Sequence, residues 1–282
     1  MIWITKLKWT DSKIAFLIAM LGSLPLLFYN AFLHDFPMGY AGLFTQMAKQ
    51  IADASFALPS QSPYYGPGGI PFAYPPLGLY VLAICIKLTG KYYIFLRFFP
   101  PLYSLFAVGL TFLLAQKFFK QPFLSMIVAI LTATSVDLYV AHTWSSGVVR
   151  ALAFIFTILV LYFYSPNPDE RTRKDIFLAG LFFGLAGLSH LAYALFCFFW
   201  VVSASISFRD WKKTITDPLL AGLTALVTIS VWVIPVAVRY GWTVFFGAFN
   251  SHGGSDLIGE AFNFASLIHL FLINLEPILS NP

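Results

Sequence analysis

The stretch that decides the fold is "IAFLIAMLGSLPLLFYNAFLHD", residues 14–35. Its first twenty residues, Ile14 to Leu33, are almost entirely apolar, and an α-helix of that length crosses a bilayer core of about 30 Å. No small-residue cleavage site follows, so the stretch is expected to remain as a transmembrane helix and not to act as a signal peptide. It closes on His34 and Asp35, an imidazole and an acid at the predicted membrane surface.

The composition agrees with a membrane protein. Of 282 residues, 59% are hydrophobic and only 10% are charged, whereas a soluble domain carries about 25% charged residues. The net charge of +5 comes from basic residues dispersed between apolar segments, which does not resemble a basic nucleic-acid-binding stripe. The two cysteines, Cys85 and Cys197, lack the spacing of a zinc site. We therefore expect contact with the lipid bilayer and none with nucleic acid.

Basic residues predict the topology. Lys6, Lys8 and Lys13 precede the first helix, so the positive-inside rule predicts a cytoplasmic N-terminus and an exoplasmic position for His34 and Asp35. Three further basic clusters are expected on the cytoplasmic side: Lys117 with Lys120; Arg171 with Arg173 and Lys174; and Arg209 with Lys212 and Lys213.

Two apolar segments must then fold in particular ways. Residues 75–90 are expected to lie in the exoplasmic interface, because a crossing there would carry the next basic cluster to the wrong side. Residues 176–207 lie between two basic clusters and are expected to form a hairpin of two short helices turning near Ser189 and His190. The other helices are predicted at about 95–116, 122–140, 147–164 and 218–238, with an eighth beginning near 262. The predicted fold is all-α, a polytopic bundle of about eight helices in one transmembrane domain, 1–282.

The long first exoplasmic loop has two parts. Residues 40–53 place apolar side chains on one helical face and polar ones largely on the other, which fits either an interfacial helix or a helix packed on the protein's own surface. Residues 59–76 contain six prolines and three glycines and are expected to form a loop outside the hydrocarbon region.

Ionisable side chains collect on the exoplasmic side of this topology. These are His34, Asp35, Arg97, Asp137, His142, Arg150, His190, Arg239, His252, Asp256 and Glu260. Because charges are costly in a membrane without a partner or a role, the gathering predicts a site for an anionic ligand with proton transfer. Asp35 is the strongest single candidate, since a carboxylate directly after a span and before Phe36 and Pro37 has little structural purpose.

Structural explanations remain open for the other residues. Arg97, Arg150 and Arg239 are also explained by snorkelling to the interface. Asp137 is also explained by capping a turn, His252 by a loop position, and His190 by a hydrogen bond to a neighbouring carbonyl.

The order of these features resembles the GT-C type membrane glycosyltransferases, which include protein O-mannosyltransferases and aminoarabinose transferases. Helix 1 ends in Asp35, and an amphipathic segment follows. The stretch "YPPLGLYVLAICIKLTG" (74–90) is similar to the family's PPL element and second interfacial helix. "LRFFPPLYSLFAVGLTFLLAQKFF" (96–119) resembles its second helix, and "LAGLFFGLAGLSHLAYAL" (178–195) its glycine-rich hairpin.

The resemblance implies a polyprenyl-phosphate-linked sugar donor and inversion at the anomeric carbon. By matching position, Asp35 is the general base for the acceptor hydroxyl, with His34 as its neighbour, or a ligand for a divalent cation such as Mg²⁺ or Mn²⁺. Arg97, Arg150 and His190 are implied to lie near the lipid phosphate. The loop 59–76, which includes Tyr74, is implied to shape the donor or acceptor cleft.

The chain also departs from the family pattern. Many members carry two adjacent acids where this chain has His34 and Asp35. Many also carry an aspartate just before the helix that corresponds to the one predicted here at 147–164, where this chain has "AHTWSSGVVR". The family continues through several more helices, so the C-terminal part is expected to be missing. These departures favour one alternative, a noncatalytic GT-C-like partner subunit. A transporter of lipids or solutes is a separate alternative.

Overall fold

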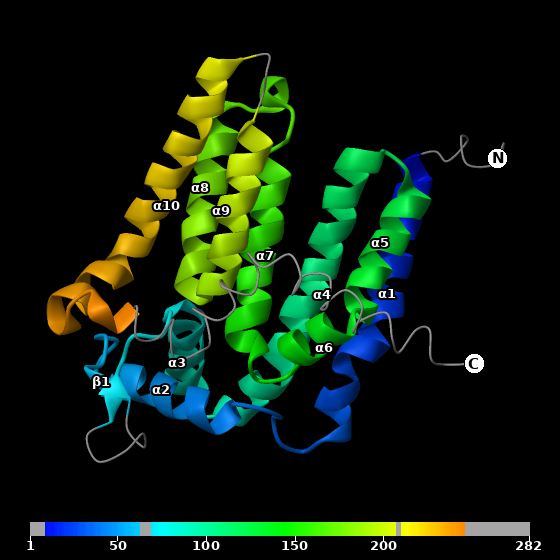
Figure 1. Cartoon of the computed structure of the whole chain (residues 1–282). Helices are drawn as coiled ribbons and strands as arrows, with labels where there is room; N and C mark the ends of the chain where they lie inside the picture. The colour runs from blue at the N-terminus through cyan, green and yellow to red at the C-terminus, as the bar shows by residue number, and fades with distance from the viewer. Residues whose placement is uncertain (1–8, 63–68, 207–209, 246–282) are drawn as a thin grey trace, which may run out of the picture. The chain divides into compact units, whose positions relative to one another are not determined.

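The computed structural model describes residues 9–62, 69–206 and 210–245, except the side chains of 9–10 and 136–138. The α-helices are α1 (Trp9–Leu33), α2 (Ala41–Asp53), α3 (Leu77–Thr89), α4 (Tyr92–Phe119), α5 (Pro122–Thr134), α6 (Val136–Thr143), α7 (Gly147–Phe163), α8 (Arg173–Ser189), α9 (Leu191–Ser205) and α10 (Trp211–Tyr240). A short 3-10 helix, η2 (Pro168–Glu170), precedes α8, and β1 (Gln61–Ser62) pairs antiparallel with β2 (Ile70–Pro71). The all-α class is confirmed (Figure 1).

Three helices are long and apolar enough to cross a membrane. Among the described residues these are α1, α4 and α10. The helices α3, α5, α7 and α9 are apolar but have 17 residues or fewer, short of the roughly 20 that a typical crossing needs. A membrane protein is therefore supported, whereas the number of about eight spans stays a prediction. The expected eighth helix near 262 lies outside the described residues.

The predicted hairpin is confirmed. α8 ends at Ser189 and α9 begins at Leu191. Between them His190 adopts an extended backbone, with φ −164° and ψ 122°, which breaks the helical hydrogen-bond series. The turn falls at the residues that the charge-based topology indicated.

The predicted helix 122–140 is instead two helices. α5 ends at Thr134, Ser135 is extended with ψ 117°, and α6 starts at Val136. The hydroxyls of Thr132 and Thr134 donate to main-chain carbonyls of the preceding turn. Such bonds compete with the regular ladder and favour a helix end.

The helices pack in two groups joined by α4 and α7 (Figure 1). α1, α4 and α5 enclose one apolar cluster, and α7, α8 and α9 enclose another with the first half of α10. Glycines allow α8 to approach α10 closely. A Cβ at Gly180 would lie 2.5 Å from the Ala221 carbonyl oxygen, and one at Gly184 would lie 2.4 Å from the Thr228 Cβ.

α2 and α3 pack together at one end of the helices. Phe44, Met47 and Ile51 of α2 are buried in an apolar cluster with Leu79 and Leu82 of α3. The apolar face of 40–53 thus packs on the protein's own surface, one of the two alternatives that its pattern left open.

Contacts divide the chain into two compact units, residues 1–233 and 234–282. α10 continues into the second unit as far as Tyr240, and Gly241 follows with φ +77°. The packing and the site described below belong to the first unit.

The first unit has two chemically different ends. At one end, α4 and α7 finish and α8 and α10 begin; we call it the basic end. There Lys117 Nζ donates to the Tyr162 carbonyl at 2.6 Å. We call the histidine end the one where α1 finishes, α4 and α7 begin, and α8 turns into α9. The three basic clusters that the sequence grouped lie at the basic end, as far as the described residues reach.

Candidate functional site

Arg150 belongs to a polar group at the histidine end. It lies in the first turn of α7 and is half-buried. Its positive charge acts on His142 of α6, Tyr193 of α9 and Tyr74, which precedes α3. Within the described part of the chain, its guanidinium forms no ion pair. The positive charge of Arg150 is therefore not neutralised by a described carboxylate and can attract an anionic ligand.

A glycine fixes the start of α7. A Cβ at Gly147 would lie 1.9 Å from the carbonyl oxygen of His142, so only glycine allows the chain to pass this close to α6. The end of α6 and the first turn of α7 are thereby held together, which brings His142 and Arg150 into one group.

His142 and Tyr193 form the buried part of this group. The Nε2 atom of His142 is hydrogen-bonded to the Tyr193 hydroxyl, and its ring lies 5.0 Å from the ring of Phe154. The ring of His190 meets that of Tyr193 edge-on at 5.5 Å. Tyr193 thus links two histidines that the sequence separates by 48 positions.

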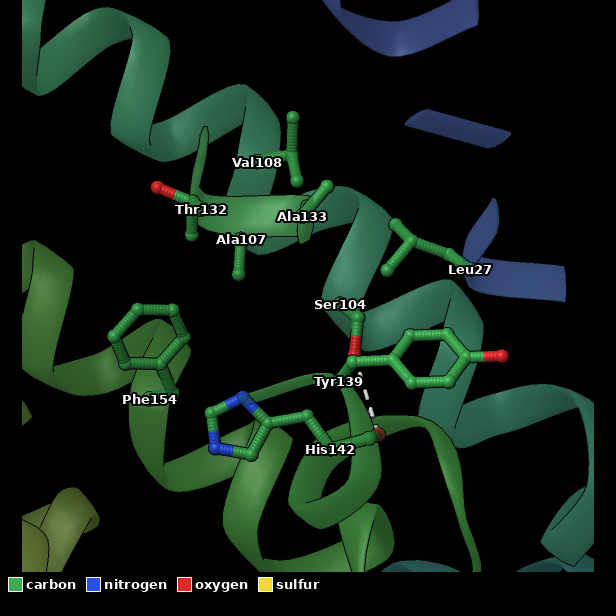
Figure 2. A pocket seen from close by; sticks show the side chains of 9 residues that line it. All are labelled: Leu27, Ser104, Ala107, Val108, Thr132, Ala133, Tyr139, His142 and Phe154. Carbon is green, nitrogen blue, oxygen red and sulfur yellow. Dashed lines mark hydrogen bonds between the residues drawn. The ribbon is translucent and has the colours of Figure 1, made fainter. Parts of the chain in front are cut away.

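The imidazole of His142 also borders a small pocket (Figure 2). The pocket has about 250 Å³ of empty space, including its open mouth. Ser104 donates to the His142 carbonyl at 3.2 Å, and the Tyr139 hydroxyl points away from the pocket. Apolar side chains line most of the remainder, so the imidazole is the main polar group facing this space.

Burial shifts the pKa of two members of the group, His142 and Tyr74. Burial, and then the charges of Arg150 and His190, lower the pKa of His142 to about 4. Burial raises the pKa of Tyr74 to about 12, although Arg150 acts in the opposite direction. Both are therefore uncharged hydrogen-bonding groups at neutral pH.

Asp35 belongs to a different part of the histidine end. It follows α1 and is exposed, and its backbone carbonyl accepts a hydrogen bond from Arg97 Nη1 at 3.3 Å. Arg97 Nε donates to the Ala31 carbonyl. The guanidinium thus hydrogen-bonds carbonyls at the C-terminal end of α1. This is a structural role within the protein, different from snorkelling toward the membrane interface. The ring of His34 lies 6.1 Å from that of Phe36, and the described contacts include no hydrogen bond between His34 and Asp35.

A second pocket lies beside Arg97. Its lining includes Pro37, Arg97, Trp144 and Ser145. The indole Nε1 of Trp144 and the buried hydroxyl of Ser145 have no hydrogen-bond partner within the described chain. The Ser145 backbone N–H donates to the Met38 carbonyl at 3.0 Å. This bond joins the loop after Asp35 to the segment that leads into Arg150.

The structure does not test whether the remaining predicted residues belong to this group. Asp137 belongs to α6, and its side chain is not described. Arg239 is exposed on α10 within the second compact unit. His252, like Asp256 and Glu260, lies outside the described residues.

The sequence interpretation missed Tyr193, Trp144 and Ser145. Tyr193 follows His190 by three positions, one helical turn, and this spacing was a usable signal. Trp144 and Ser145 carried no such signal, because their surroundings come from distant segments.

The residues present do not fit the divalent cation that the family resemblance implied. Within the described chain, no three His, Cys, Asp or Glu side chains gather as metal ligands. The Asp35 carboxylate has no second acid in its described contacts, so no step of the chemistry below uses a metal.

Comparisons of this chain with family models, with curated proteins and with solved structures found no match. The functional conclusion accordingly depends on the residues and their arrangement.

Proposed function

We propose that the protein is a membrane glycosyltransferase that moves a sugar from a polyprenyl-phosphate donor to an acceptor hydroxyl. The observation that carries this proposal is the half-buried Arg150, which has no ion-pair partner among the described residues and whose charge acts on Tyr74, His142 and Tyr193. An unpaired guanidinium next to neutral hydrogen-bond donors, at the end of an apolar bundle, suits the phosphate of a lipid-linked substrate. The resemblance to the GT-C family supports the same substrate.

Each group has a role in the proposed reaction. Asp35 accepts the proton of the acceptor hydroxyl as that oxygen attacks the anomeric carbon. The bond from the anomeric carbon to the phosphate oxygen breaks, and polyprenyl phosphate leaves with the electron pair. Negative charge develops on the leaving phosphate, where Arg150 and the neighbouring neutral donors stabilise it.

The two parts of the site are connected through the main chain. The hydrogen bond from Ser145 to Met38 joins the loop that carries Asp35 to the segment before α7. The second pocket, with the indole N–H of Trp144 and the hydroxyl of Ser145, lies along this connection.

The membrane orientation follows from the charges. The basic end is assigned to the cytoplasm by the positive-inside rule, which assigns the histidine end to the exoplasmic side and the N-terminus to the cytoplasm. The proposed membrane is the plasma membrane.

One observation favours a second candidate function. The Asp35 carboxylate is exposed and takes no part in the described contacts of the Arg150 group. A noncatalytic partner subunit that binds polyprenyl phosphate without transferring its sugar requires only the Arg150 group.

The test measures sugar transfer and lipid binding separately. Membranes containing the full-length protein are supplied with polyprenyl-phosphate sugars and a mixed acceptor extract, for wild type, Asp35→Asn, Arg150→Gln and the exposed control Lys91→Gln. In parallel, the purified variants are titrated with polyprenyl phosphate. We expect Asp35→Asn to lose transfer while retaining binding, and Arg150→Gln to lose both.

The other outcomes have distinct meanings. Transfer that survives Asp35→Asn removes the catalytic role of this acid. Binding by wild type without transfer favours the partner subunit. Binding that is equal in wild type and Arg150→Gln overturns the phosphate site.

A further inference from the structure

The basic end carries exposed cations that fold stability does not explain. Lys120, Arg173, Lys174 and Lys212 are all exposed, and none forms an ion pair within the described residues. They surround one short segment: the charge of Lys120 acts on Glu170, and Lys213 Nζ lies 3.1 Å from Asp169 Oδ1. The four cations are therefore neighbours around η2 and the starts of α8 and α10.

The described carboxylates around this segment are engaged elsewhere. Asp169 pairs with Lys213, and Glu170 accepts hydrogen bonds from Ser165 at 3.0 Å and Asn167 at 3.1 Å. Other acids cap helices. Asp175 forms a reciprocal capping box with Thr172, and Asp210 accepts from the backbone N–H groups of Lys212 and Lys213. Within the described residues, none of these carboxylates forms an ion pair with the four exposed cations.

Three of the cations occupy unfavourable positions. Arg173 and Lys174 lie in the first turn of α8, and Lys212 lies in the first turn of α10. Helix N-termini carry a partial positive charge, so basic side chains there cost free energy when nothing negative is present. An anion at this surface would remove that cost.

Exposed aromatic side chains stand directly beside the cations. Phe119, 49% exposed, precedes Lys120, and Trp211, 69% exposed, precedes Lys212. Aromatic rings next to cations at the ends of membrane-length helices are typical of the boundary between acyl chains and headgroups. A soluble acidic partner would account for the cations but not for the rings.

We propose that the basic end binds anionic phospholipids, with the phosphate headgroup at Lys120, Arg173, Lys174 and Lys212 and the acyl chains against Phe119 and Trp211. The inference is independent of sugar transfer, because all of these residues lie at the end opposite Arg150. It identifies a second phosphate-binding surface, one that takes bilayer lipid and not substrate.

The test compares lipid retention by the full-length protein purified in detergent. Phosphatidylglycerol and phosphatidylcholine with identical acyl chains are added, and bound lipids are counted by native mass spectrometry. The test variant is Lys120→Gln/Arg173→Gln/Lys174→Gln/Lys212→Gln, and the matched control is Lys87→Gln/Lys91→Gln, two exposed lysines at the histidine end. We expect wild type and control to prefer phosphatidylglycerol, with the affinity falling about fivefold for each basic-end cation removed.

Salt and single variants keep the outcome interpretable. The preference should weaken as ionic strength rises, since the surface is exposed. If the fourfold variant does not fold, Lys120→Gln and Lys212→Gln are each expected to lower the preference separately. Equal retention of both lipids by wild type, or a preference unchanged in the basic-end variants, would overturn the proposal.

Discussion

The two ends of the bundle differ in how their arginine side chains are paired. At the basic end, Arg171 is buried and paired with Asp217 at 3.0 Å, and its Nη2 atom donates to the Ala204 carbonyl. At the histidine end, Arg150 is half-buried and has no ion pair within the described chain. The difference teaches that buried charge in this protein has two purposes. Arg171 joins helices, whereas Arg150 has no structural partner and is available to a ligand.

The same contrast appears within the histidine end. The guanidinium of Arg97 donates hydrogen bonds to the carbonyls of Ala31 and Asp35, where α1 ends. Arg97 and Arg150 carry the same charge and were predicted to have the same role, but only Arg150 keeps its donors away from the main chain in the described contacts. The following predictions test this contrast.

The largest effect is expected from Arg171→Met. The change leaves Asp217 buried without its partner, and breaking one side of a buried ion pair costs about 3–5 kcal/mol of unfolding free energy. Thermal unfolding in detergent measures the loss. The double variant Arg171→Met/Asp217→Leu should recover much of it, because an apolar pair leaves no uncompensated charge. A single variant as stable as wild type would contradict the structural role.

Arg150→Gln should change function and not stability. Loss of the donor that faces the leaving phosphate is expected to lower sugar transfer about a hundredfold or more, with the unfolding temperature nearly unchanged. Arg97→Gln is the matched comparison. It should lower the unfolding temperature, because the carbonyls at the end of α1 lose their donors. Reversal of these two patterns would invert the assignment.

His142 should make the protein less stable as the pH falls. Its pKa is about 4 when folded and about 6.5 when unfolded, so the unfolded chain takes up a proton that the folded protein does not. Between pH 7 and pH 5 this costs about 2 kcal/mol of unfolding free energy. Unfolding temperatures of wild type and His142→Gln at the two pH values isolate the effect. An identical pH dependence in both would show that His142 does not titrate in this way.

The sequence predicted those features that depend on local pattern and on charge. Helix positions, the break at His190 and the common end of three basic clusters follow from apolar periodicity and the positive-inside rule. The convergence of Arg150, His142 and His190 at one end follows from the same topology, whereas Tyr74 was expected there only from the family resemblance. The structure shows these residues at one end of the bundle, and their role in catalysis stays a prediction.

The partners of individual side chains could not be predicted in this way. Arg171 meets Asp217 across 46 positions, and Arg97 meets Ala31 across 66. Such contacts are set by how whole helices pack, and a single sequence carries no local signal for them. The extended Ser135 was missed although Thr132 and Thr134 precede it, because apolar residues continue on both sides of this short polar stretch.

The smallest effect is expected from Lys213→Gln, at the second ion pair that joins the segment before α8 to α10. Lys213 and Asp169 lie 3.1 Å apart, about as close as Arg171 and Asp217, but their side chains are 38% and 72% exposed. Water screens such a pair, so its loss should cost less than about 1 kcal/mol, and wild type and variant should converge as salt rises. Unfolding temperatures in roughly 0.1 M and 1 M salt measure both effects. A cost as large as that of Arg171→Met would mean that distance and not burial decides the strength of these pairs.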